Sequence, residues 1–313
     1  MGDLKGKVLV SPSSFGKLDP APLEALSGTG LEVVNNPYGR RLTKGEVIGL
    51  LVEVCGIVAG LEPLDEDVMT KSDLKVISRC GSGMSNVDQD AAARLGIEVY
   101  STPYGPTEAV AELTLGALLG LLRHVPRMDR SLHEGKWDKR IGVQLQGKTV
   151  TIIGYGRIGR RVAEVMQPFD VSILVVDPFL DGQDVEHPVM ALEEALPQAD
   201  IVSLHLSGEE QVLGEKEFAA MKEGVYLLNG ARGGLVDEEC LVKNLESGKV
   251  AGAWIDAFGV EPYEGPLTGF DQVVLTPHIG SYALECRRSM EMESAMNLIN
   301  ALRRLQQAGD SPA

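Results

Sequence analysis

Three side chains late in the sequence have types and spacing that could carry out acid–base chemistry. Arg232 lies in the glycine-rich segment NGARGGLVDE, Glu261 lies in IDAFGVEP, and His278 lies in TPHIG. A guanidinium can hold a carboxylate through two parallel hydrogen bonds and polarise an adjacent carbonyl. An imidazole can exchange a proton with a hydroxyl near neutral pH, and a carboxylate beside it orients the ring. These residue types therefore predict acid–base chemistry on a 2-hydroxy or 2-keto acid.

Each of the three residues has an ordinary structural alternative when it is taken alone. An arginine in a glycine-rich loop is often a surface residue, a lone histidine is more often structural than catalytic, and Glu-Pro commonly marks a turn. All three, however, follow short apolar runs typical of parallel strands, and active sites of doubly wound sheets lie at the carboxyl edge of the strands. Their joint placement favours the catalytic interpretation. The apolar runs are 225–229, 251–255 and 272–276.

A glycine-rich motif, VTIIGYGRIG, indicates a dinucleotide site. Gly154, Gly156 and Gly159 have the spacing G-x-G-x-x-G directly after a predicted strand and before a predicted helix. Such glycines permit a tight turn and a close approach of the backbone to a pyrophosphate, which the helix N-terminus attracts. Asp177 ends the next strand and could bind both ribose hydroxyls while repelling a 2′-phosphate. The motif predicts NAD rather than NADP, although an ordinary turn is the alternative for the glycines and for Asp177.

Short apolar runs alternate with helix-like segments along most of the chain. Strands that alternate with helices indicate a parallel sheet with crossover helices. One series precedes a strongly apolar predicted helix at 107–125 and a second series follows it, so the sequence predicts two α/β domains of unequal size. A final amphipathic helix is predicted at 285–307. The remaining apolar runs are 7–12, 31–35, 56–59 and 75–78 in the first series and 149–153, 171–176 and 200–205 in the second.

The composition narrows the classes of function. The chain has 313 residues and a net charge of −16, which disfavours binding to nucleic acid and to anionic membranes. The cysteines are widely separated and form no cluster with histidine, so we expect no metal and a reducing compartment. The first residues do not resemble a signal peptide, and the longest apolar stretch, 113–122, is too short to span a bilayer. We therefore expect a cytoplasmic protein. The cysteines are Cys55, Cys80, Cys240 and Cys286.

Longer motifs connect these residues to a known family. The chain also contains RCGSGMSNVD (79–88), TEAVAELTLGALL in the predicted apolar helix, and GKW (135–137). Together with NGARGGLVDEE, IDAFGVEP and TPHIGS, these motifs are specific. Over residues 74–299 the sequence resembles the D-isomer-specific 2-hydroxyacid dehydrogenase family, and within it the short phosphoglycerate dehydrogenases. The resemblance implies an NAD-dependent oxidoreductase that acts on a D-2-hydroxy acid.

The resemblance also implies roles for individual residues. Arg232 would bind the substrate carboxylate and carbonyl, His278 would act as general acid and base, and Glu261 would pair with the histidine. Asp256 would contact the nicotinamide carboxamide. The predicted substrate contacts are Arg79, Gly81, Ser82, Gly83 and Arg232. The predicted cofactor contacts are Gly154, Gly156, Arg157, Ile158, Gly159, Asp177, Leu206, Ser207, Ala231, Asp256 and Gly280.

The fold implied by the resemblance is a doubly wound, parallel-sheet Rossmann NAD domain plus a smaller flavodoxin-like α/β substrate domain. The substrate domain would be discontinuous, with residues 1–104 and 284–313, and the NAD domain would span 105–283. The same resemblance implies a homodimer formed through the apolar helix at 107–125.

The identity of the acid remains open at the level of sequence. The leading candidates are 3-phosphoglycerate and 3-phosphohydroxypyruvate, the pair used in serine biosynthesis, and the alternative is glyoxylate, hydroxypyruvate or another 2-keto acid. Family members that act on phosphoglycerate often carry an arginine just after the third strand, whereas this chain reads VAGLEP at 58–63. Arg40, Arg41 and Arg79 are other cations that could bind a phosphate, although the loop at 36–44 could equally be a solvated turn.

A third interpretation belongs to another class of protein. Some members of this family are NAD-sensing corepressors, which use the fold to recruit partners rather than to turn over a substrate. The presence of Arg232, Glu261 and His278, together with the acidic composition, favours an enzyme. Formate dehydrogenase is disfavoured because that branch of the family has glutamine where Glu261 stands.

Overall fold

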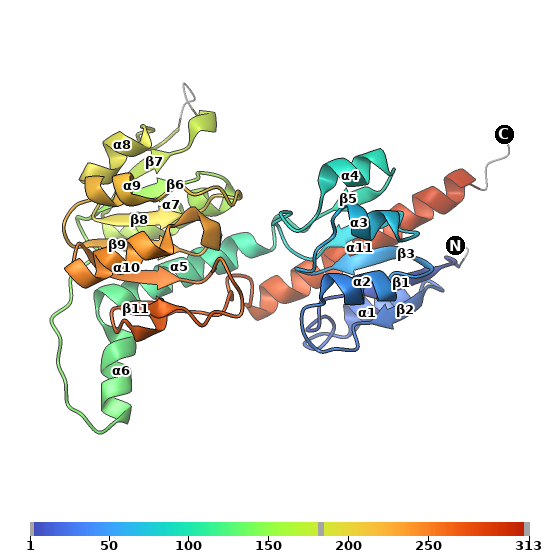
Figure 1. The fold of residues 1–313 in the computed structure, drawn as a ribbon, viewed down its shortest axis with the longest axis horizontal. Helices are drawn as coiled ribbons and strands as arrows, with labels where there is room; N and C mark the ends of the chain where they lie inside the picture. Colours follow the sequence, from blue (N-terminus) through green and yellow to red (C-terminus); the bar gives the residue numbers. More distant parts are fainter. Residues whose placement is uncertain (1–2, 181–184, 310–313) are drawn as a thin grey trace. The chain divides into compact units, whose positions relative to one another are not determined.

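The structure is a computed structural model that describes residues 3–180 and 185–309. Its contacts divide the chain into two compact units, and each unit is built on one parallel sheet (Figure 1). Unit 1 contains the chain up to Pro106 and from Ser281 onward, and unit 2 spans Thr107–Gly280. The fold class expected from the sequence, two parallel α/β sheets, is confirmed. The predicted domain limits differ from these units by two or three residues.

Unit 1 has five parallel strands in the order β2-β1-β3-β4-β5. This is the flavodoxin-like order, in which the chain first moves outward on one side of β1 and then returns to build the other side. The central strands β3 and β4 are almost wholly buried, which is typical of parallel strands covered on both faces. The strands are β1 (Lys7–Val10), β2 (Glu32–Asn35), β3 (Val54–Ala59), β4 (Val76–Arg79) and β5 (Glu98–Tyr100).

Polar side chains define where the short helices of unit 1 begin. Thr43 and Glu46 form a reciprocal capping box at the start of α2, and Asp65 caps α3 in the same way as Asp88 caps α4. The last helix, α11, contacts β3, β4, β5 and α1, so both ends of the described chain contribute to one domain. The helices are α1 (Ala21–Ser27), α2 (Lys44–Leu50), α3 (Glu66–Thr70), α4 (Gln89–Arg94) and α11 (Leu284–Gly309).

Unit 2 has six parallel strands in the order β11-β10-β9-β8-β6-β7. The strand order reverses between β6 and β8, and β6 leads into the glycine-rich motif. The strands are β6 (Thr149–Ile153), β7 (Ser172–Val176), β8 (Ile201–Leu204), β9 (Val225–Asn229), β10 (Val250–Ile255) and β11 (Val273–Leu275). The helices are α5 (Pro106–Leu122), α6 (Val125–His133), α7 (Arg157–Met166), α8 (Leu192–Ala195), α9 (Glu215–Ala220) and α10 (Glu238–Ser247).

The apolar helix predicted at 107–125 is shorter than expected. It ends at Leu122, because His124 adopts a left-handed conformation with φ of 54° and a separate helix, α6, then starts at Val125 with Pro126 in its first turn. The two helices are bent by 66° at this break. Among the described residues, no single helix is long and apolar enough to cross a membrane, and only this bent pair meets the length and composition criteria together.

Candidate active site

His278 and Glu261 form a pair at the carboxyl edge of the sheet in unit 2. The ring nitrogen Nδ1 of His278 lies 3.0 Å from Oε1 and 3.2 Å from Oε2 of Glu261. Both side chains are about one-third exposed or less, so the pair is accessible to a small molecule. Glu261 also accepts a hydrogen bond from the backbone N–H of Phe258 at 3.2 Å, which fixes the carboxylate on its loop. An Nδ1–H donated to Glu261 leaves Nε2 as the nitrogen that can exchange a proton with a substrate.

The backbone of His278 is held in an unusual conformation by Asp256. His278 has a φ of 53°, which is uncommon for a residue with a side chain. The carboxylate of Asp256 accepts hydrogen bonds from the backbone N–H groups of Ile279 and Gly280, both at 2.9 Å, and from the hydroxyl of Thr276 at 2.6 Å. Asp256 is only 1% exposed. Its clear role in the structure is therefore to anchor the His278 loop, and its predicted contact with nicotinamide stays a prediction.

The buried Trp254 extends this anchor into the core of unit 2. Its indole Nε1 donates a hydrogen bond to Oγ1 of Thr276 at 3.0 Å, and the hydroxyl of Thr276 then donates to Asp256. The sequence alone predicts no role for Thr276 or Trp254 beyond their places in a loop and a strand. No local sequence pattern connects Asp256 with Thr276, because the two residues meet only when β10 and β11 pair.

Arg232 lies in the loop that follows β9, beside the loop that carries Glu261. Asn229 fixes the Arg232 loop, since its side chain accepts from the Ala231 N–H at 3.2 Å and donates to the Arg232 carbonyl at 2.9 Å. The guanidinium donates to the carbonyl of Ala231 at 2.7 Å. A methyl group placed on Gly233 would lie 1.9 Å from the carbonyl carbon of Phe258. The two loops therefore touch through their backbones, and only glycine fits at this position.

The glycine-rich motif has the geometry that a dinucleotide requires. Gly154 has a φ of 90°, and a methyl group there would lie 2.8 Å from the backbone of His205. A methyl group on Gly159 would lie 2.1 Å from the carbonyl oxygen of Gly154, whereas one on Gly156 would meet nothing within 4 Å. Open backbone at Gly156 and the start of α7 at Arg157 provide N–H groups for a pyrophosphate.

Asp177 is placed to bind a ribose at the end of β7. Its two carboxylate oxygens accept hydrogen bonds from the backbone N–H groups of Tyr155 at 2.8 Å and Phe179 at 3.0 Å. These bonds hold the carboxylate against the glycine-rich turn, and each oxygen has further capacity to accept a hydroxyl. The described residues at this edge of unit 2 therefore fit NAD.

The remaining predicted cofactor contacts gather in the same unit. Leu206 and Ser207 directly follow β8, next to Gly154, and Ala231 precedes Arg232. Gly280 lies close to its neighbours, since a methyl group there would lie 3.2 Å from Val110 and 3.4 Å from Asp256. Their contacts with a cofactor remain predictions.

His205 was not singled out from the sequence, although it stands at the end of β8. Its Nε2 lies 2.8 Å from the hydroxyl of Ser203, and among the described residues its buried Nδ1 has no hydrogen-bond partner. Burial lowers the pKa of His205 to about 4, so the ring is neutral at physiological pH. A polar residue that directly follows a strand facing the glycine-rich turn is the signal that could have identified it.

The predicted substrate residues Arg79, Gly81, Ser82 and Gly83 belong to unit 1. Arg79 ends β4 and is buried, and its Nη1 donates a hydrogen bond to the carbonyl of Cys80. Gly81 has a φ of 148°, and a methyl group on it would lie 2.0 Å from that Nη1. Gly81 thus lets the arginine fold back over the turn, while Ser82 and Gly83 are half-buried. Their contacts with substrate remain predictions.

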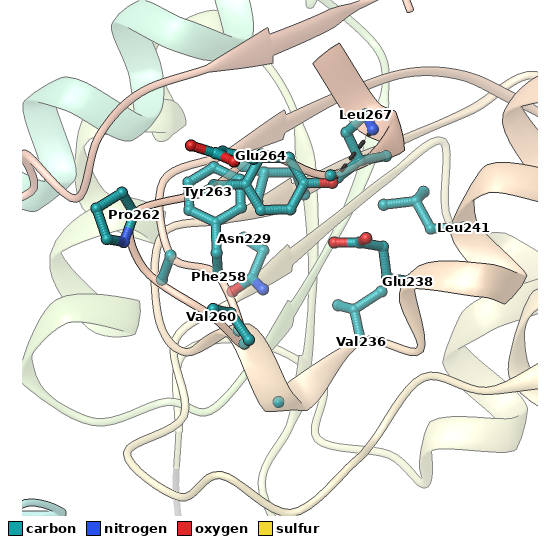
Figure 2. Close-up of a pocket in the computed structure, with 16 residues that line it drawn as sticks. Asn229, Val236, Glu238, Leu241, Phe258, Val260, Pro262, Tyr263, Glu264 and Leu267 are labelled. Carbon is teal, nitrogen blue, oxygen red and sulfur yellow. Dashed lines mark hydrogen bonds between the residues drawn. The ribbon is translucent and has the colours of Figure 1, made fainter. Parts of the chain in front are cut away.

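A cavity of about 590 Å³ lies beside the Arg232 and Glu261 loops of unit 2 (Figure 2). It is lined by residues that flank Arg232 and Glu261 rather than by these residues themselves. Figure 2 shows the Phe258 and Tyr263 rings stacked beside it, with centroids 4.3 Å apart. The hydroxyl of Tyr263 accepts a hydrogen bond from the N–H of Leu267 at 3.2 Å, which folds the loop back on itself. The loop that carries Glu261 therefore forms one wall of this cavity.

Comparison with known proteins agrees with this geometry. Residues 115–280 match the model of the D-isomer specific 2-hydroxyacid dehydrogenase family, NAD binding domain. This chain belongs to that family. The family predicted from the sequence is thus confirmed, and so is NAD as its cofactor. Among the residues that the structure describes, no group of three or more histidine, cysteine or acidic side chains could hold a metal ion.

The relatives of this chain are named for different enzyme activities. It is 36% identical to D-3-phosphoglycerate dehydrogenase of Rattus norvegicus over 95% of this chain, but it spans only 56% of that relative's length. It is also 36% identical to hydroxypyruvate reductase of Thermotoga maritima, over 83% of this chain and 89% of the relative. The crystal structure of TT0316 protein from Thermus thermophilus is similar, with a TM-score of 0.86, 35% identity, and coverage of 95% of this chain and 97% of that chain.

Proposed function

We propose that this dehydrogenase interconverts a D-2-hydroxy acid and its 2-keto acid with NAD. The pairing of His278 with Glu261 at 3.0 Å supports the proposal most directly, because it combines a proton-exchanging ring with a carboxylate that orients it. Arg232, on the neighbouring loop, supplies the cation for the substrate carboxylate.

The residues suggest the following division of roles during oxidation. The guanidinium of Arg232 binds the substrate carboxylate, and Nε2 of His278 accepts the proton of the 2-hydroxyl. The resulting imidazolium is stabilised by Glu261, which already accepts from Nδ1. When bound, NAD supplies the acceptor for the hydride that leaves carbon 2. In the reverse direction, His278 returns the proton to the carbonyl oxygen as the hydroxyl forms.

Between the two substrate classes, we favour a short unphosphorylated 2-keto acid, hydroxypyruvate or glyoxylate. A phosphate dianion needs available cations, and the guanidinium of Arg40 is already paired with Glu46, at 2.7 and 3.0 Å. Arg79 is buried and bonds to the Cys80 carbonyl. The second candidate is 3-phosphoglycerate with 3-phosphohydroxypyruvate, in serine biosynthesis. The name of the rat relative and the exposed cation Arg41 support that candidate.

We also propose a homodimer in the cytoplasm. The segment after α5 carries three apolar side chains that are largely exposed: Leu132 at 57%, Trp137 at 79% and Ile141 at 98%. The three side chains are close in the sequence, and patches of exposed apolar side chains mark interaction surfaces. A second copy of the chain is the expected partner, and sedimentation of the purified protein tests this directly.

The first test is NADH oxidation by the purified chain with glyoxylate, hydroxypyruvate and 3-phosphohydroxypyruvate. We expect the highest of the three kcat/KM values with an unphosphorylated acid, either glyoxylate or hydroxypyruvate. A higher kcat/KM for the phosphorylated acid by about 10²-fold would favour the second candidate. Tight NADH binding without turnover of any acid would instead favour an NAD-sensing binding protein.

A further inference from the structure

The side chain of Trp254 lies between two neighbouring loops of unit 2. It is near the carboxyl end of β10, the strand that separates β9 from β11 in the sheet. Its register partners are Leu228 on β9 and Val274 on β11. Because side chains two positions apart on a strand point to the same face, Trp254 shares a face with Gly230 and Thr276, which directly follow those strands.

The six-membered ring of Trp254 fills the space beside Gly230. A methyl group placed on Gly230 would lie 2.7 Å from Cη2 and 3.0 Å from Cζ3 of the indole. Trp254 is 0% exposed, and a ring enclosed by close-packed neighbours cannot move aside without cost. Gly230 therefore lets the backbone approach the ring, and the ring in turn supports the start of the Arg232 loop.

The five-membered ring of Trp254 is bonded to the His278 loop. Its Nε1 donates to Oγ1 of Thr276 at 3.0 Å, and the hydroxyl of Thr276 donates in turn to Asp256 at 2.6 Å. Asp256 also accepts hydrogen bonds from the backbone N–H groups of the two residues that follow His278, both at 2.9 Å. Connected hydrogen bonds restrict one another's geometry, so the position of the indole constrains the backbone at His278.

One side chain thus supports two loops that carry different functional groups. We infer that Trp254 is a positioning residue that fixes where Arg232 and His278 stand relative to each other. Packing on Gly230 sets the first loop, and the bond to Thr276 sets the second. The inference rests on the proposed function, in which the arginine holds the substrate carboxylate and the histidine exchanges the proton. A misplacement of about 1 Å can lower a rate by about 10²-fold, so a shared support for both groups affects turnover.

The two contacts of Trp254 should affect different kinetic constants. Arg232 binds a carboxylate that is present in the substrate and in the transition state, so displacement of its loop raises KM for the acid. His278 moves a proton only in the chemical step, so displacement of its loop lowers kcat. A side chain that only stabilised the fold would change neither constant of the folded molecules.

The experiment uses Trp254→Phe, Gly230→Ala and the double variant, each in the full chain. Phenylalanine removes the Nε1 donor and the outer atoms of the indole, and it leaves a space that a methyl group on residue 230 can fill. Gly269→Ala is the matched control for the glycine, since a methyl group there meets nothing within 4 Å. NADH oxidation with hydroxypyruvate and with glyoxylate gives kcat and KM of each protein, and urea unfolding gives its stability.

We expect Trp254→Phe to lower kcat about tenfold and to raise KM about threefold. Gly230→Ala alone should raise KM about tenfold, because its methyl group overlaps the indole. In the double variant, KM should return to within about twofold of the wild-type value while kcat stays low, because the space is filled but the donor is still missing. Gly269→Ala should match the wild type. Variants that lose stability but keep the wild-type kcat and KM would show a purely structural role and overturn the inference.

The hydrogen bond is also tested from its other end, which decides the matter even if Trp254→Phe does not fold. Thr276→Ser keeps the hydroxyl and should retain kcat within about twofold, whereas Thr276→Val has a similar shape without the hydroxyl and should lower kcat about tenfold. Equal kcat values for these two variants overturn the inference, and so does a KM that the double variant does not restore. Failure of the wild type to reduce any 2-keto acid overturns the proposed function and, with it, the role of Trp254.

Discussion

The carboxyl edges of the two sheets carry different kinds of residue. In unit 2, Gly233 lies against the backbone of the Glu261 loop and Gly154 against that of His205, so the loops of this edge pack backbone against backbone. In unit 1, the edge carries the buried carboxylate of Glu62, a hydroxyl that has no partner among the described residues, and a folded-back arginine. The two edges are therefore fixed differently: close backbone contacts hold the loops of unit 2, whereas side-chain hydrogen bonds hold those of unit 1.

The largest effect is expected from the residue that exchanges the proton. His278→Ala should lower kcat by at least about 10²-fold for every acid, because no other group replaces the proton transfer. NADH affinity, measured by fluorescence titration, should be nearly unchanged. The loss of kcat should be equal for all acids, because each of them needs the same proton transfer. Full turnover by this variant would remove His278 from its proposed role.

The close contact between the Arg232 loop and the Glu261 loop should be almost as sensitive. Gly233→Ala would place a methyl group 1.9 Å from the Phe258 carbonyl carbon, so the loops must separate. We expect the free energy of unfolding to fall by about 2–4 kcal/mol and kcat to fall with it. Urea unfolding measures the first quantity. Gly259→Ala in the same contact region is the matched control, since a methyl group on Gly259 meets nothing within 4 Å.

A smaller effect, confined to the cofactor, is expected at Asp177. Asp177→Asn keeps an oxygen that can accept one of the two backbone hydrogen bonds but removes the charge that repels a 2′-phosphate. The ratio of kcat/KM for NADH over NADPH should fall by about tenfold, equivalent to ~1.4 kcal/mol. The relative rates with different acids should stay constant. An unchanged cofactor ratio would mean that another group selects NAD.

The sequence predicted unit 2 better than unit 1 for a physical reason. The edge of unit 2 depends on glycines and on residues that directly follow strands, and such local patterns can be recognised in a chain. Strand β5 was missed because it has only three half-buried residues. The apolar helix was extended too far because one left-handed residue, His124, ends it.

Contacts between distant segments could not be predicted from local patterns. Asp256 anchors the His278 loop through residues that follow it by 20 to 24 positions, and Asn86 fixes the Glu62 turn from 24 positions away. Arg40 is a different case, because its partner Glu46 belongs to the capping box of α2, which follows directly in the sequence. A T-x-x-E pattern beside the two arginines was the available signal, and it indicates that Arg40 stabilises a turn.

The smallest expected effect is at Arg41, the exposed cation beside this turn. Arg41→Ala should change kcat/KM by less than about twofold for hydroxypyruvate, glyoxylate and 3-phosphohydroxypyruvate alike, because an exposed charge contributes little in water. Arg94→Ala, which removes an exposed arginine of α4 in the same unit, is the matched control. A selective loss of about tenfold for the phosphorylated acid would show a cationic subsite in unit 1. Such a result would change the comparison, because unit 1 would then supply a cation for an anionic group of the acid.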